Sequence, residues 1–422
     1  MRYPLVLIFG LPLVCSPIMA QDQKKESKPG VNPPTVARAL LVGTKILLAN
    51  QEHYSRDRRV GRMRDDQLED WQKQERKRLA KLRTDGESNV EWPYEGVYRV
   101  GGSVPPGYRV GGSAIACQAL VLAPGFAINV NSKVAVLRSI EFMLDQLENN
   151  ELLAPSSAHR YDVRGWAHTY ALEFFLLAER KRVTGKNAER IKKMIPHLIR
   201  CLAKSETSQG GWNYANNKCS PFMTGSTLLA LFQARKQGYE FDKGLVDRAL
   251  IALEKSRAKT GSYVYSGIAT PGRQRRTAAM PGACARAAIA ELCLFRAGRS
   301  DAKRVRVAVD AFFEHWGELF KRKSKQGTHE GPYGIAPYYF IYGHTYAALA
   351  IEVLPEKDRP KLRIKMQEIL WRTREKDGGW NDRIFPRSKS YTTAMAMLAL
   401  LAPGLDPIPA WPQGEAGKKG GR

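Results

Sequence analysis

The sequence predicts an all-α protein of six helical hairpins, and three observations carry that prediction. Amphipathic stretches recur at a regular step, an apolar stretch rich in small residues follows each of them, and a Gly-Gly-Trp loop occurs twice. The chain has 422 residues, 43% of them hydrophobic, which suits a folded globular protein and excludes collagen-like or low-complexity chains. Because the step is long enough for two helices and two loops, it indicates a repeat architecture.

The amphipathic stretches are the predicted outer helices. The stretch 188–204, for example, carries its apolar residues at helical spacing: Ile191, Met194, Ile195, Leu198 and Leu202. A first unit, 36–123, is lengthened by a charged insertion. Five further units follow it at steps of 53 to 59 residues, beginning near Ala135, Ala188, Lys243, Ala302 and Arg359.

The second helix of each hairpin is apolar on nearly all sides, as the stretch 394–401 illustrates with Ala-Met-Ala-Met-Leu-Ala-Leu-Leu. Such a helix must be buried among other helices. An open stack of hairpins would expose one apolar end, and no polar capping repeat is evident. The sequence therefore predicts a closed ring, an α/α toroid, with the apolar helices inside.

The repeat is itself duplicated. Gly210-Gly211-Trp212 returns as Gly378-Gly379-Trp380, and a threonine follows each tryptophan by 12 residues, at Thr224 and Thr392. The string His-Thr-Tyr-Ala occurs at 168–171 and again at 344–347. These offsets, of 168 and 176 residues, predict a pseudo-twofold arrangement of three plus three hairpins. We interpret both Gly-Gly-Trp motifs as structural, since glycine permits the tight turn and the indole can cover a helix end.

These outer helices, Gly-Gly-Trp loops and Ala-rich inner helices resemble the repeats of squalene/hopene cyclases and protein prenyltransferase β-subunits. The resemblance covers nearly the whole mature chain and implies a divergent, exported member of that terpenoid cyclase/prenyltransferase superfamily. In the cyclase repeat a glutamine precedes the tryptophan by six residues, whereas this chain has Glu206 and Arg374 there.

The catalytic motifs of the superfamily are incomplete. The cyclases use an Asp-x-Asp-Asp acid motif, which this chain lacks. Prenyltransferases hold zinc with Asp-x-Cys and a later histidine; Cys284 and His344 match two of these ligands, but Gly282 stands where the aspartate should be. Because a catalytic zinc needs three protein ligands, we interpret Cys284 and His344 as at most a relic and expect no metal and no cofactor.

The resemblance to a toroid places the inner-helix N-termini around one mouth of a central cavity. Aromatic side chains with a few charges suit a carbohydrate or a flat apolar ligand, and the alternative is that they close the end of an aromatic core. Asp162 and Asp382 are expected to stay ionised beside Arg164 and Arg383, and so to be unable to protonate an alkene. The candidate residues are Tyr161, Asp162, Arg164, His168, Tyr338, Tyr339, Tyr342, His344, Asp382 and Tyr391.

The ends of the chain have their own patterns. Residues 1–20 have the short apolar core of a signal peptide, which predicts export to the periplasm or beyond the cell. We expect a disordered linker at 21–33, the toroid at 34–406 with a charged rim insertion at about 55–85, and a disordered tail at 407–422. Cleavage of the signal peptide leaves no segment that could span a membrane.

The net charge is +26, and +25 after loss of Arg2, which favours an acidic surface or polymer as a partner. No specific nucleic-acid motif accompanies this charge.

Three functions remain open at this point. The first is an exported toroid that binds an unknown ligand or partner in its cavity without polyene-cyclase chemistry. The second is a terpenoid cyclase-like or transferase-like enzyme, which an apolar aromatic cavity with one buried acid would favour. The third is a polysaccharide lyase or glycosidase, which a close pair of carboxylates would favour.

Overall fold

The computed structural model describes residues 35–54, 89–156, 162–270, 276–325, 327–336 and 339–412. The expected signal peptide (1–20), linker (21–33) and rim insertion (55–85) lie outside the described residues, as do Tyr161 and Tyr338. All described residues belong to the unit that begins at Thr35. Within them every regular element is a helix, and strand-like pairing is confined to isolated bridges.

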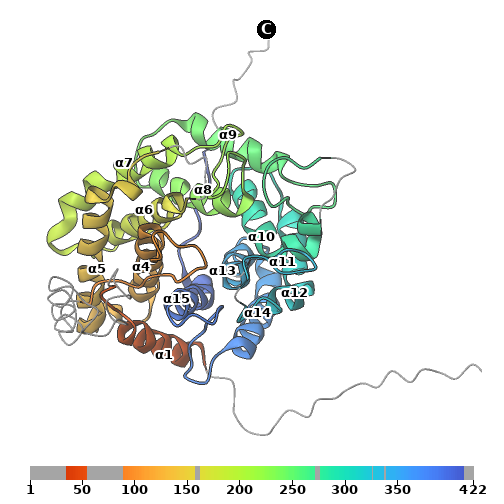
Figure 1. Ribbon diagram of the computed structural model, residues 1–422. Coiled ribbons are helices and arrows are strands. Elements are labelled where there is room, and N and C mark those ends of the chain that lie inside the picture. The colour runs from red at the N-terminus through yellow and green to blue at the C-terminus, as the bar shows by residue number, and fades with distance from the viewer. Residues whose placement is uncertain are drawn as a thin grey trace, which may run out of the picture. The chain divides into compact units, whose positions relative to one another are not determined.

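The six described inner helices form a closed ring (Figure 1). Each packs against the next, and the last packs against the first, so the expectation of an α/α toroid is confirmed. The described inner helices are α4 (Pro106–Leu122), α6 (Arg164–Arg180), α8 (Pro221–Lys236), α10 (Met280–Arg296), α13 (Tyr339–Ile351) and α15 (Ser388–Leu401).

The outer helices surround this ring and alternate with the inner ones along the chain (Figure 1). Five of them begin at the predicted residue, and α5 begins earlier because Asn129 caps it by accepting a hydrogen bond from the Ser132 amide at 3.0 Å. The described outer helices are α1 (Val36–Ala49), α5 (Val130–Asn149), α7 (Ala188–Lys204), α9 (Lys243–Lys255), α11 (Ala302–Glu314) with the short α12 (Trp316–Phe320), and α14 (Arg359–Thr373).

Small residues let these helices approach closely. A Cβ atom added at Gly225 of α8 would lie 2.8 Å from the Ile289 side chain of α10, and one added at Gly43 of α1 would lie 2.6 Å from the sulfur of Met397 in α15. Real side chains do not approach this closely, so a larger residue at either position would force the neighbouring side chain to move. The Gly43 contact lies where the first outer helix meets the last inner helix, so it helps to close the ring.

The two Gly-Gly-Trp motifs each connect an outer helix to the following inner helix. The Trp212 indole donates to the Leu202 carbonyl oxygen at 2.8 Å, and the Trp380 indole donates to that of Leu370 at 2.9 Å. Both tryptophans are fully buried. Gly210 and Gly378 have φ angles of 85° and 89°, which only glycine adopts without strain. These contacts agree with a structural role for the two motifs, Gly210, Gly211 and Trp212 and Gly378, Gly379 and Trp380, which stays a prediction.

The two copies of this motif differ in one detail. The Trp212 amide donates to the Thr224 hydroxyl at 2.9 Å, whereas the Trp380 amide donates to Thr393 at 3.1 Å and not to Thr392. Thr392 instead receives the Asp382 amide at 3.2 Å. The second copy of the loop is therefore one residue longer between the tryptophan and its threonine.

A third tryptophan plays the same part without the glycines. The Trp92 indole donates to the Leu47 carbonyl oxygen at 2.7 Å, and its amide donates to the Ser113 hydroxyl at 2.8 Å. The link between α1 and α4 therefore repeats the geometry of the later two. Sequence reasoning missed Trp92 because no Gly-Gly pair precedes it.

The end of the chain packs further than expected. Residues 402–412, which we call the C-terminal strap, were expected to be disordered from 407 onward, but Trp411 is buried and stacks with Phe232 and Phe241 at 5.5 and 6.1 Å. The Trp411 amide also donates to the Arg296 carbonyl oxygen at 2.9 Å. An aromatic anchor, overlooked in the sequence, holds this segment. The rest of the expected tail, 413–422, lies outside the described residues.

Replacing Trp411 with alanine should therefore release the C-terminal strap while leaving the ring folded. We expect the backbone amides of residues 405 and 411 to lose protection in hydrogen exchange. Global stability should fall by only about 1–2 kcal/mol, because a terminal segment can detach alone. Phe320→Ala, at an aromatic residue that is 42% exposed on α12, is the control. Unchanged protection in the Trp411→Ala variant would contradict this anchoring role.

Candidate functional site

The mouth formed by the inner-helix N-termini is filled by aromatic side chains. Tyr94 lies 4.4 Å from Tyr391, ring centre to ring centre, and Tyr108 lies 5.4 Å from Trp166. The void left between these rings is about 20 Å³, room for a single water molecule. Tyr391, predicted to line a cavity, is instead part of this aromatic plug.

His168 and His344, the two histidines predicted for the site, are buried and face the outer layer. His168 donates from Nε2 to the Leu153 carbonyl oxygen at 2.8 Å. His344 donates from Nδ1 to the Phe340 carbonyl oxygen at 2.7 Å and accepts the Trp316 indole proton at Nε2, at 2.9 Å. Burial lowers the pKa of each imidazole to about 4, so both are neutral and serve packing.

Asp162 and Arg164 form an ion pair of 2.6 Å at the beginning of α6. The Asp162 carboxylate also accepts the Arg164 amide at 2.8 Å, and the guanidinium donates to the Ala154 carbonyl oxygen at 2.6 Å. This arrangement closes the start of the helix. It places no charge in a cavity.

Tyr339 and Tyr342 pack around Phe222, at 5.2 and 4.4 Å between ring centres. The Tyr342 hydroxyl donates to the Phe222 carbonyl oxygen at 2.8 Å. Cys284, the second half of the zinc resemblance, donates to the Pro281 carbonyl oxygen at 3.4 Å, and burial raises the pKa of its thiol to about 12. In the described part of the chain no group of three or more His, Cys, Asp or Glu side chains can hold a metal ion.

Asp382 departs from the prediction that a neighbouring arginine keeps it ionised. It is 0% exposed, and neither carboxylate oxygen makes a hydrogen bond with a described residue. Burial raises the pKa of its carboxyl to about 7 and outweighs the opposing effect of Arg383. The Asp382 carboxyl is thus only partly ionised at neutral pH, and it lies near Tyr391 of the aromatic plug.

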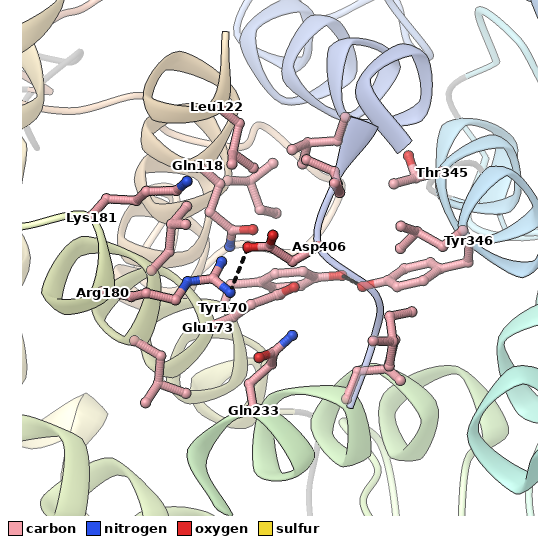
Figure 2. A pocket seen from close by; sticks show the side chains of 18 of the residues that line it. Gln118, Leu122, Tyr170, Glu173, Arg180, Lys181, Gln233, Thr345, Tyr346 and Asp406 are labelled. Atoms are coloured by element: carbon pink, nitrogen blue, oxygen red, sulfur yellow. Dashed lines mark hydrogen bonds and ion pairs between the residues drawn. The ribbon is translucent and has the colours of Figure 1, made fainter. Parts of the chain in front are cut away.

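The central cavity lies at the opposite end of the ring, among the C-terminal halves of the inner helices (Figure 2). Its volume is about 160 Å³. None of the eight described candidate residues lines it. Apolar and aromatic side chains form most of the wall, among them Leu176, Leu229, Leu349 and Met395. Leu405 and Ile408 of the C-terminal strap form part of the rim.

Glu173 is the acid inside this cavity. Burial raises the pKa of its carboxyl to about 7, while the neighbouring Gln118 amide acts in the opposite direction. Gln118 is only 5% exposed, and its Nε2 atom has no well-aligned hydrogen-bond partner among the described residues. Figure 2 shows Gln118, Glu173 and Gln233 extending toward the same space beside Tyr170. The cavity therefore offers a carboxyl group that is about half protonated at neutral pH, with a buried amide beside it, within a largely apolar wall.

Tyr170 and Tyr346 meet at the centre of the ring, where their hydroxyl oxygens lie 3.2 Å apart (Figure 2). They are the tyrosines of the two His-Thr-Tyr-Ala strings. Burial raises the pKa of both phenols, so both remain protonated at physiological pH. They form a polar floor to the cavity.

An ion pair between described residues lies at the rim. Arg180, at the end of α6, contacts Asp406 of the C-terminal strap at 3.0 Å (Figure 2). The Asp406 side chain is 59% exposed, so this pair contributes little stability of its own. It does fix where the strap crosses the cavity.

The cavity residues had a sequence signal, but an ambiguous one. Gln118, Glu173 and Gln233 are single polar residues inside apolar inner helices. Glu291 of α10 shows the same pattern, yet it points outward and is satisfied by Tyr263 at 2.7 Å and Arg257 at 2.8 Å. Only the direction of each side chain separates the two cases.

The fold defines the class of this protein: it is an α/α toroid. No known family's sequence profile matches the chain, and no curated protein sequence matches it. Among the described helices, none is both long and apolar enough to cross a bilayer.

Solved structures with a similar fold include enzymes of different chemistry. A type II terpene cyclase, MstE from Scytonema, is 11% identical with a TM-score of 0.47, over 88% of this chain and 98% of that one. A possible GH105-family member from Salmonella enterica is 12% identical with a TM-score of 0.44, over 92% and 98%. An α-1,6-mannanase, GH76A of Salegentibacter, is 13% identical with a TM-score of 0.44, over 69% and 88%. These likenesses concern the fold alone.

Proposed function

We propose that this protein is an exported binding protein whose central cavity holds one small, weakly polar molecule by hydrogen bonds from Glu173 and Gln118. The observation that carries the proposal is a carboxyl group of raised pKa beside a buried amide with poorly satisfied hydrogen bonding, both in one largely apolar cavity. Buried polar groups without partners are costly, and a ligand oxygen would satisfy both.

The size of the cavity limits the ligand. Its volume of about 160 Å³ is close to that of engineered apolar cavities, of about 150 Å³, that hold benzene. A ring of six or seven heavy atoms with one oxygen fits this space. A triterpene does not.

The strength of the acid argues against polyene cyclisation. Protonating an unactivated alkene needs a strong carboxylic acid, whereas the pKa of Glu173 is raised to about 7. No second acid assists it, because the other carboxylate at the cavity, Asp406, is paired with Arg180. The same pairing leaves the glycosidase alternative without the free pair of carboxylates it requires.

One observation favours a second candidate, an enzyme with cyclase-like or transferase-like chemistry. A general acid works best when its pKa is near the working pH, and Glu173 meets that condition. As an acid it would act on a group more basic than an alkene, such as a carbonyl or epoxide oxygen. Product formation from such a compound, lost in Glu173→Gln, would replace the binding proposal with this one.

The binding proposal predicts a pH dependence for a neutral acceptor. Cyclohexanone, titrated by calorimetry, should bind the mature protein more tightly at pH 6 than at pH 8, by about tenfold, because protonated Glu173 donates and the carboxylate does not. Glu173→Gln keeps a donor at every pH and should remove the dependence. Glu148→Gln, on the outer helix α5, is the matched control. Equal affinity of the unaltered protein at both pH values, or no binding, would contradict the proposal.

A further inference from the structure

A second hollow lies on the other side of the C-terminal strap. It is a cleft of about 440 Å³ between the C-terminal ends of α10 and α13 and the beginning of α14. Leu349, Leu405, Asp406 and Ile408 line both this cleft and the central cavity. The strap therefore separates two hollows of different character, and the volume of the second lies within the range of small-molecule sites.

Three arginines line this cleft, and they are not equally paired. Arg363 is neutralised by Glu352, with 2.9 Å between Nε and Oε1. The other acid of the cleft, Asp406, forms an ion pair with Arg180 at 3.0 Å. Arg359 donates from Nε to the Leu354 carbonyl oxygen at 2.7 Å and has no carboxylate partner among the described residues. Its charge is thus uncompensated.

Arg296 is the more exceptional of the two unpaired arginines. It lies at the last residue of α10, its Nε is fully buried, and its side chain makes no hydrogen bond or ion pair with any residue the structure describes. Burial lowers the pKa of the guanidinium, and no nearby carboxylate opposes that effect. The Arg296 side chain as a whole is half-buried, so its guanidinium still reaches solvent from the cleft while the buried Nε lacks a partner.

We propose that this cleft binds a small dianion, a dicarboxylate or a phosphate monoester, through Arg296 and Arg359. Two uncompensated guanidinium groups match two negative charges, and the planar fork of each group suits the oxygens of a carboxylate or a phosphate. The apolar wall formed by Phe295, Val353 and Ile408 accommodates the carbon skeleton between the charged groups. This site does not depend on Glu173 or on the ligand of the central cavity.

The test is calorimetric titration of the mature protein with two probes, succinate and glycerol phosphate, at low ionic strength. We expect saturable one-site binding of at least one probe, weakened at least tenfold in Arg296→Gln and in Arg359→Gln. The matched control is Arg200→Gln, which removes the same charge from an exposed position on the outer helix α7 and should leave binding unchanged. Arg296→Lys keeps the charge but loses the planar fork, so it should bind more weakly than the unaltered protein.

Each outcome decides the proposal. Binding of succinate alone identifies a dicarboxylate site, binding of glycerol phosphate alone identifies a phosphate site, and binding of both shows that the paired charge is what is recognised. No saturable binding of either probe overturns the proposal. An equal loss in Arg200→Gln and Arg296→Gln overturns it too, because the effect would then belong to the net charge of the surface. If Arg296→Gln does not fold, Arg359→Gln and Arg296→Lys carry the same comparison.

Discussion

Replacing Trp380 with alanine is expected to lower the free energy of unfolding by about 3–5 kcal/mol, the usual cost of removing a large buried aromatic side chain. Trp380 is 0% exposed, and its indole donates to the last turn of α14 at the Leu370 carbonyl oxygen. The variant leaves a cavity where the last outer helix meets the last inner helix. Urea unfolding followed by circular dichroism measures the loss.

Two further variants separate the contributions. Trp380→Phe keeps most of the ring packing and removes the hydrogen bond, so it should cost clearly less than alanine. Trp212→Ala should cost about as much as Trp380→Ala, because its indole makes the equivalent bond to Leu202. A loss below about 1 kcal/mol in both alanine variants would show that these loops are not structural supports of the ring.

Replacing Asp382 with asparagine is expected to stabilise the protein at pH 8. The pKa of the buried carboxyl is raised to about 7 in the folded chain, against about 3.9 in the unfolded chain, so the folded state binds the proton more tightly. The stability that this carboxyl contributes is therefore present below pH 4 and is lost as the pH rises through 7. The loss amounts to about 4 kcal/mol at roughly 1.4 kcal/mol per pH unit.

Asparagine has nearly the same shape as aspartate but does not titrate. The stability of the variant should therefore not show this decline as the pH rises through 7. The measurement is the unfolding free energy at pH 5 and pH 8 in both proteins. Asp247→Asn, an exposed position on α9, controls for the loss of one negative charge. The slope that remains in Asp382→Asn combines Glu173, which is shifted in the same direction, with His168 and His344, whose lowered pKa values act in the opposite direction below about pH 6.5. An unchanged slope, or a loss of stability at pH 8, would contradict the assignment.

The fold was predictable because it depends on periodicity. Apolar residues such as Ile191 and Leu198 fix which face of an outer helix is buried, and small residues such as Gly225 fix how closely the inner helices pack. Both are local properties that a sequence displays directly. The duplicated Gly-Gly-Trp loops also indicated that the chain consists of two sets of three hairpins.

The site was not predictable because it depends on where individual side chains point. His344 looked like a functional residue, yet its Nε2 atom accepts a hydrogen bond from the Trp316 indole of the neighbouring α12. Glu173 and Glu291 look alike in the sequence, but only Glu173 faces the cavity. Such distinctions arise from contacts between distant segments, which no local pattern contains.

The hydroxyl contact between Tyr170 and Tyr346 has a consequence for how the chain arose. A residue that touches its own equivalent is typical of a twofold axis between two identical subunits, so a three-hairpin ancestor that formed dimers would have had this contact already. In such a dimer both subunits contribute the same residue at each position near the axis. One turn further along, Glu173 has Leu349 as its counterpart, and both line the cavity. Two glutamates there would repel each other. In a single chain the two positions can differ, and here a nearly symmetric frame encloses a single glutamate.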